Sequence, residues 1–95
     1  MYEIMVRLRA TFNLATFKLA CAELVKQYGV HYARAQSSDY KVRRSGRNEV
    51  NRLSVWVAEL KAHSYSIDGA TSAMEGMRGK LSMIEEEKAD KLSAF

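Results

Sequence analysis

Hydrophobic and polar residues alternate at the start of the chain. The hydrophobic positions in this alternation are Tyr2, Ile4, Val6 and Leu8. Successive side chains of a β-strand point to opposite faces, so a period of two predicts a strand with one buried face. We therefore predict a strand over residues 2–8, and we expect Arg7 and Arg9 to lie on its exposed side.

A period of three to four residues replaces this alternation further along the chain. The apolar stripe consists of Leu14, Phe17, Cys21, Leu24 and Tyr28. This spacing places all of these side chains on one side of a helix. Thr11 or Asn13 is expected to cap the helix, because a short polar side chain accepts a hydrogen bond from a free backbone N–H there. Gly29 is expected to end it, since glycine readily adopts the left-handed conformation found after many helices.

Two shorter strands are predicted in the middle of the chain, over residues 30–36 and 39–43. Each places aromatic or β-branched side chains on one face, as strands do. Residues 37–38, two serines, connect the strands as a hairpin, although such turns usually contain glycine or asparagine. Residues 45–47, Ser-Gly-Arg, are predicted to form a loop.

The last half of the chain is predicted to be helical. One stripe comprises Val50, Leu53, Val57 and Leu60, and a second comprises Ile67, Ala70, Met74, Met77, Leu81 and Ile84. Asn48 is expected to cap the first of these helices. A turn at Asp68 and Gly69 would separate two packed helices. One continuous helix over residues 48–92 is the alternative.

The predicted order of elements is strand, helix, strand, strand, helix, helix. This order indicates an α+β fold, with a small three-stranded sheet in the order β-α-β-β-α-α and helices packed on one face of it. The chain would finish in a helical hairpin or in one long helix. A length of 95 residues allows one domain, so we predict a single domain over residues 1–95.

Composition excludes several classes of protein. The hydrophobic share of 47% is that of a globular chain. No apolar run approaches the roughly 18–20 residues that cross a bilayer, and the charged N-terminus lacks the apolar region of a secretory signal. We therefore expect a cytoplasmic protein with no membrane partner. The single cysteine, Cys21, excludes an internal disulfide.

Charge is distributed unevenly along the chain. Residues 1–47 carry a net charge of +6 and residues 48–95 carry −2, which together give +4. A cationic cluster attracts polyanions or acidic protein surfaces, and arginine binds phosphate through forked hydrogen bonds while tyrosine stacks on bases. The residues predicted to bind nucleic acid or an acidic partner are Arg7, Arg9, Arg34, Tyr40, Lys41, Arg43, Arg44 and Arg47.

A second candidate site lies near the C-terminus, where Gly76 and Gly79 enclose Arg78 and are followed by Lys80. This segment resembles the Gly-x-x-Gly loop of the KH nucleic-acid-binding modules. In that family the loop joins two helices, and its glycines let the backbone approach the phosphates. The resemblance implies that the two glycines contact phosphates while the two cations supply charge. The alternative is that both glycines lie inside a helix and permit close packing against a neighbour.

The final predicted helix is rich in methionine, a flexible apolar residue that suits adaptable interfaces. Its candidate partner-binding face comprises Met74, Met77, Leu81 and Ile84. This face would dock into a partner protein or pair with a second copy of the chain as a homodimer. Alternatively, it covers other elements of the same chain.

Residues suited to catalysis do not form a recognisable motif. His31 and His63 have no metal-binding spacing, and Cys21 belongs to an apolar stripe, where burial keeps a thiol inert. We therefore predict a non-enzymatic protein without metal or cofactor, which binds nucleic acid or a nucleic-acid-binding complex through its basic surface. The alternative function is an adaptor or inhibitor that contacts a host or partner protein through the methionine-rich helix.

Overall fold

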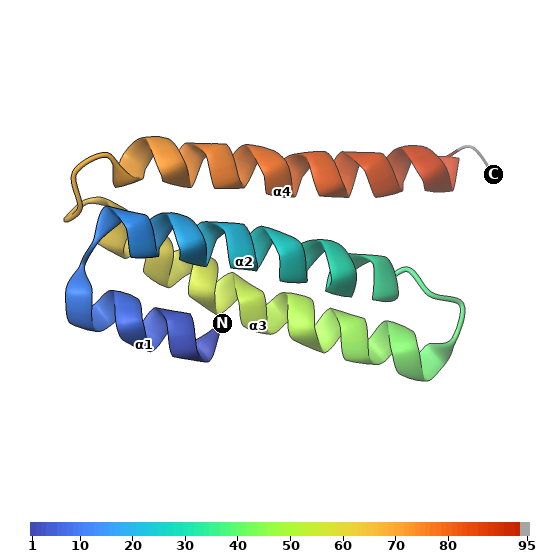
Figure 1. Ribbon diagram of the computed structural model, residues 1–95. Coiled ribbons are helices and arrows are strands. Elements are labelled where there is room, and N and C mark those ends of the chain that lie inside the picture. The colour runs from blue at the N-terminus through green and yellow to red at the C-terminus, as the bar shows by residue number, and fades with distance from the viewer. Residues whose placement is uncertain (94–95) are drawn as a thin grey trace.

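The computed structural model describes residues 1–93, with side chains described for residues 1–87, and it contains four α-helices. They are α1 (Tyr2–Thr11), α2 (Leu14–Arg34), α3 (Tyr40–Ser64) and α4 (Ala70–Ser93) (Figure 1). Residues 1–93 contain no strand, so the predicted α+β fold with a three-stranded sheet is wrong. No helix in this range combines the length and the apolar character that crossing a bilayer requires.

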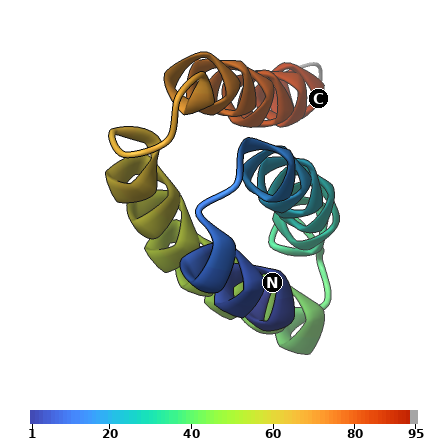
Figure 2. The ribbon, with the colours of Figure 1, turned by 60° about the vertical axis from the view of Figure 1, so that its left-hand side comes forward.

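Helix α2 is the centre of the arrangement, because it contacts each of the other three helices. Helices α1 and α4 lie on opposite sides of α2, and α3 runs along it in the opposite direction (Figures 1 and 2). Helix α4 runs in the same direction as α2 and also contacts α3. The first half of α3 and the second half of α4 therefore border opposite sides of the C-terminal half of α2.

The hydrophobic core lies where the four helices meet. Its largest fully buried side chains are Phe17, Met5, Leu8, Leu24 and Leu60. Full burial of such a side chain stabilises the folded state by about 1.5–3 kcal/mol. Much of the predicted stripe on α2 is confirmed, because Phe17, Cys21, Leu24 and Tyr28 are buried. Helix α4 completes the core with Ala70, Met74 and Met77.

The predicted first strand is the helix α1. Its buried side chains are Met5 and Leu8, three positions apart, with Ile4 packed beside them. Tyr2 and Val6, which the alternation placed on the buried face, are exposed. A short helix satisfies most of its own backbone hydrogen bonds, whereas a lone strand needs a neighbour. No other segment of residues 1–93 forms a strand that could pair with residues 2–8, so this segment is helical.

Helix α2 begins as predicted but continues beyond its predicted end. The Asn13 side chain accepts hydrogen bonds from the backbone N–H groups of Ala15 and Thr16 at 2.7 and 3.3 Å, which confirms this cap. Gly29 does not end the helix; it lies inside α2, where an added Cβ would contact Ile84 at 3.8 Å. Residues 30–34, predicted to begin the second strand, form the last turn of α2.

Helix α3 contains residues 40–43 of the predicted third strand and the predicted loop at residues 45–47. It begins after Asp39, whose side chain accepts hydrogen bonds from the N–H groups of Lys41 and Val42, so the cap predicted at Asn48 is wrong. Gly46 is buried inside α3 against the last turn of α2. This glycine marks a close approach of two helix backbones rather than a break in the chain.

The C-terminal half forms two helices rather than one. The turn predicted at Asp68 and Gly69 is confirmed: Gly69 has a φ of 81°, which glycine adopts without strain. An added Cβ at Gly69 would also meet the Leu14 side chain at 3.2 Å. The chain therefore reverses here, and α4 packs along α2.

Candidate nucleic-acid interface

The first half of α3 carries most of the cations that the sequence singled out. Lys41, Arg44 and Arg47 are exposed, and they follow one another at intervals of three residues. Arg43 is half-buried and its guanidinium lies 5.7 Å from the centre of the Tyr40 ring. This arrangement is typical of a cation–π contact, in which the guanidinium is attracted to the face of the ring.

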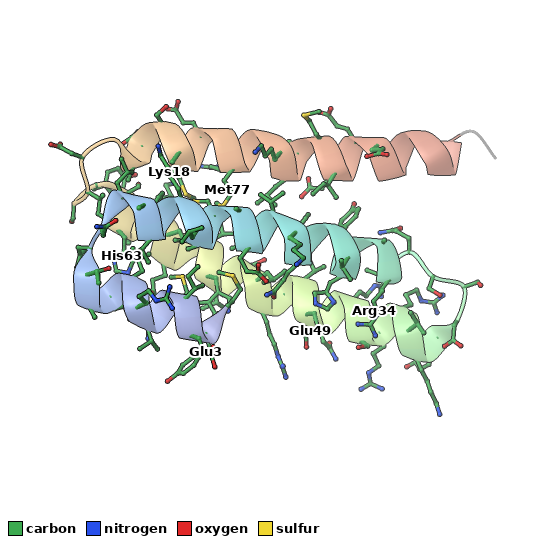
Figure 3. All side chains as sticks on the ribbon, in the orientation of Figure 1. Glu3, Lys18, Arg34, Glu49, His63 and Met77 are labelled. Atoms are coloured by element: carbon green, nitrogen blue, oxygen red, sulfur yellow. The ribbon has the colours of Figure 1, made fainter. Side chains whose placement is uncertain are left out.

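Arg34 joins this group from the end of α2. Its guanidinium donates a hydrogen bond to the Ser45 hydroxyl at 3.1 Å and approaches His31 Nδ1 at 3.4 Å. Figure 3 shows Arg34 near the end of α2, beside the first half of α3. We call the following group the α3 basic surface: Arg34, Lys41, Arg43, Arg44 and Arg47. Among residues with described side chains, none of the five is paired with a carboxylate.

The helix itself adds to the positive potential of this surface. The first turn of α3 contains no acidic residue. The N-terminal end of a helix carries a partial positive charge, so a cation such as Lys41 lies where the helix dipole disfavours it. Asp39 offsets part of this charge as the cap. The positive charge at this end of α3 therefore slightly lowers the stability of the helix.

Arg52 lies five residues beyond Arg47 on the same helix, but its charge is partly neutralised. Its guanidinium lies 3.2 Å from Glu49, one turn earlier on the same exposed helix. Arg52 was not among the predicted binding residues, because the segment before it was predicted to form a strand and a loop. The spacing of Arg44, Asn48 and Arg52 places these side chains on one side of a helix once the whole segment is helical.

Arg7 and Arg9, predicted to extend the same surface, lie elsewhere. The Arg9 guanidinium donates two hydrogen bonds to the Glu59 carboxylate, at 2.6 and 2.8 Å, and lies over the Trp56 ring. These hydrogen bonds raise the pKa of Arg9 and lower that of Glu59. Arg9 therefore joins α1 to the second half of α3, and Arg7 is exposed on α1. Neither residue belongs to the α3 basic surface.

The Gly-x-x-Gly segment does not form a loop between two helices. Gly76 and Gly79 lie inside the first half of α4, and nothing lies within 4 Å of a Cβ added to either of them. The structural context that the KH resemblance implied is therefore missing, and so is the close helix packing of the alternative. Arg78 and Lys80 are exposed on α4 and are not part of the α3 basic surface.

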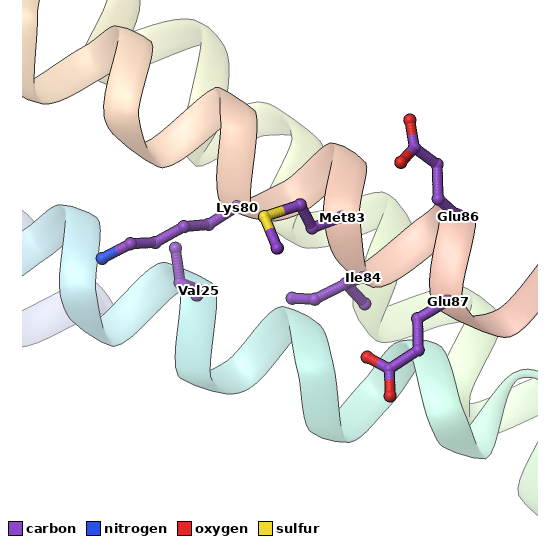
Figure 4. Close-up of a pocket in the computed structure, with 6 residues that line it drawn as sticks. All are labelled: Val25, Lys80, Met83, Ile84, Glu86 and Glu87. Carbon is purple, nitrogen blue, oxygen red and sulfur yellow. The ribbon is translucent and has the colours of Figure 1, made fainter.

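The methionine-rich face of α4 is largely packed within the chain. Met74 and Met77 are core residues, and Leu81 is partly buried against the same core. Ile84 lines a shallow hollow of about 530 Å³ between α2 and α4 (Figure 4). Its lining is Val25, Lys80, Met83, Ile84, Glu86 and Glu87. Most of the predicted partner-binding face thus covers α2.

The residues considered for catalysis are separated in the structure. Burial raises the pKa of the Cys21 thiol to about 11, so the reactive thiolate is scarce at neutral pH. His63 contacts Glu59 at 3.0 Å, and His31 lies beside Arg34 on α2. Within the described residues, no group of three or more side chains suited to metal binding occurs.

Comparison with known proteins found no matching family, no matching curated protein and no matching solved structure.

Proposed function

We propose that this protein binds nucleic acid without catalysing a reaction, and that the α3 basic surface contacts the phosphates. The observation that carries the proposal is the gathering of five cations at one end of the molecule, without a paired carboxylate among the described side chains. Four of them are arginines, whose forked donors match phosphate geometry. Tyr40 adds an exposed ring beside these cations.

The expected affinity depends on salt, because each neutralised phosphate releases counterions. The logarithm of the binding constant falls with the logarithm of salt concentration, with a slope of about −0.9 per contact on duplex DNA and about −0.7 on single strands.

An acidic protein surface would be attracted by the same charges. The methionine-rich helix gives less support to an adaptor or inhibitor, because Met74 and Met77 are buried.

The test is fluorescence anisotropy with labelled DNA and RNA, as single strands and as duplexes, over about 50–200 mM salt. The Lys41→Gln/Arg44→Gln variant should bind more weakly and show a smaller salt slope, by about one unit per lost phosphate contact. The matched control is Lys18→Gln/Lys26→Gln, which removes two exposed cations from α2 and should bind like the native protein.

Two results contradict the proposal. The first is an absence of binding to all of these probes at the lowest salt concentration. The second is an equal loss of affinity in the variant and in the control, which would show that net charge alone is responsible. In either case, a pull-down from nuclease-treated lysate and a measurement of mass in solution would distinguish a protein partner from a homo-oligomer.

A further inference from the structure

A hollow of about 350 Å³ lies between the end of α2 and the first half of α3, next to the α3 basic surface. Its lining consists of Tyr32, Ala35, Gln36, Arg47, Val50 and Asn51. The volume is at the lower end of the range for sites that bind small ligands or single groups of larger ones. The lining combines one aromatic ring, two apolar side chains, two amides and one guanidinium.

The aromatic ring that borders this hollow is supported by a second aromatic ring. The Tyr32 ring stacks on Tyr28, with ring centres 5.5 Å apart and planes inclined by 18°. Tyr28 is buried, and its hydroxyl donates a hydrogen bond to Glu85 on α4 at 2.5 Å. Contacts within α2 and between α2 and α4 thus hold the ring that borders the hollow. A ring fixed in advance loses little conformational entropy when a ligand stacks on it.

The polar groups of the hollow are not engaged elsewhere in the described part of the chain. The side chains of Gln36, Arg47 and Asn51 make no hydrogen bond or ion pair with another described residue. An amide side chain offers both donors and acceptors, which match the edges of nucleobases. Arg47 belongs to the α3 basic surface and also borders the hollow. Its guanidinium can therefore bind the phosphate of a ligand whose other part occupies the hollow.

We infer that this hollow receives one unpaired nucleobase, which stacks on Tyr32 while Arg47 binds the neighbouring phosphate. The inference rests on the proposed function and makes it more specific. Bases of a duplex are stacked and paired, so only a single strand or a loop presents a base with a free face. The protein therefore prefers single-stranded nucleic acid, and the α3 basic surface follows its backbone.

The experiment compares a labelled mixed-sequence DNA strand, its RNA counterpart and the duplex of each. The Tyr32→Leu variant should bind single strands about tenfold more weakly, as expected for loss of a base–aromatic stack, and bind duplexes as the native protein does. Tyr32→Phe keeps the ring and should retain the single-strand affinity. Tyr65→Leu, which removes an exposed ring beside the other end of α3, is the control.

A second variant tests the inference independently, in case Tyr32→Leu does not fold. Asn51 is exposed on α3, so Asn51→Leu removes an amide from the hollow and fills part of it without disturbing the core. It should also weaken single-strand binding selectively. The inference is overturned if both variants bind single strands like the native protein, or if the native protein binds duplexes equally well. Absence of binding to any probe rejects the proposed function instead.

Discussion

Gly46 allows the close approach of α2 and α3, and replacing it by alanine tests how close that approach is. A Cβ at this position would lie 2.4 Å from Ala35 N, and 2.8 Å from both Arg34 C and His31 O. To restore an ordinary contact of 3.4 Å, these atoms must retreat by 0.6–1.0 Å. All three are backbone atoms, so no side-chain rotation relieves the overlap.

The expected change is a net loss of stability in Gly46→Ala. Overpacking of this kind costs about 1–3 kcal/mol, and the backbone contacts favour the upper end of that range. Alanine returns about 1 kcal/mol through its better helix propensity. The net loss is therefore about 2 kcal/mol, which lowers the Tm by roughly 8–16 °C for a chain of this size.

Gly76→Ala provides the matched control, because it makes the same substitution in a helix without a neighbouring atom within 4 Å. It should raise the free energy of unfolding by up to about 1 kcal/mol. Urea and thermal unfolding, followed by far-UV circular dichroism, measure both variants. A Gly46→Ala protein as stable as the native chain would refute the close crossing of α2 and α3.

Three further predictions concern other parts of the fold. Asn13→Ala removes the cap of α2 and should cost about 1 kcal/mol in urea unfolding, whereas an unchanged midpoint would show that water replaces the cap. The pKa of Glu59 is held below its ordinary value of 4.5 by hydrogen bonding to Arg9, so its contribution to stability is present above that pH and is lost as pH falls through the lowered value. Glu59→Gln should thus have a lower Tm than the native protein near neutral pH, and the difference should vanish in strong acid; a constant difference would contradict this. Cys21 should react slowly with a disulfide reagent at neutral pH and quickly in denaturant, and equally fast labelling in both conditions would show that its site is open.

The candidate site was only partly predictable from the sequence. Clustering of Lys41, Arg43, Arg44 and Arg47 along the chain was sufficient to identify these cations as one group, because neighbours in sequence remain neighbours in any local structure. The hollow beside them was missed. Tyr32 lies on α2 and Asn51 lies on α3, and the two residues border the same hollow because these helices pack together. No local sequence pattern predicts that two such distant residues lie close together.

Local signals determined several features of this protein. The helical stripes, the Asn13 cap and the turn at Gly69 each depend on interactions within a few residues, so the sequence predicted them. It left Thr11 as a second candidate cap and one continuous helix over residues 48–92 as the alternative to the turn. The hydrophobic pattern of residues 2–8 is compatible with both a strand and a helix, because Ile4 and Leu8 lie on one side of either element.

Tertiary packing decided the remaining features. Glycine at positions 29 and 46 suggested chain breaks, yet both positions lie inside helices. A glycine inside a helix lowers helix stability, and this loss is offset where a side chain would collide with a neighbouring element. Only the folded structure shows that the end of α2 lies where the side chain of a larger residue at position 46 would be. The choice between strand and helix likewise depended on whether a partner strand existed, which is a property of the whole chain.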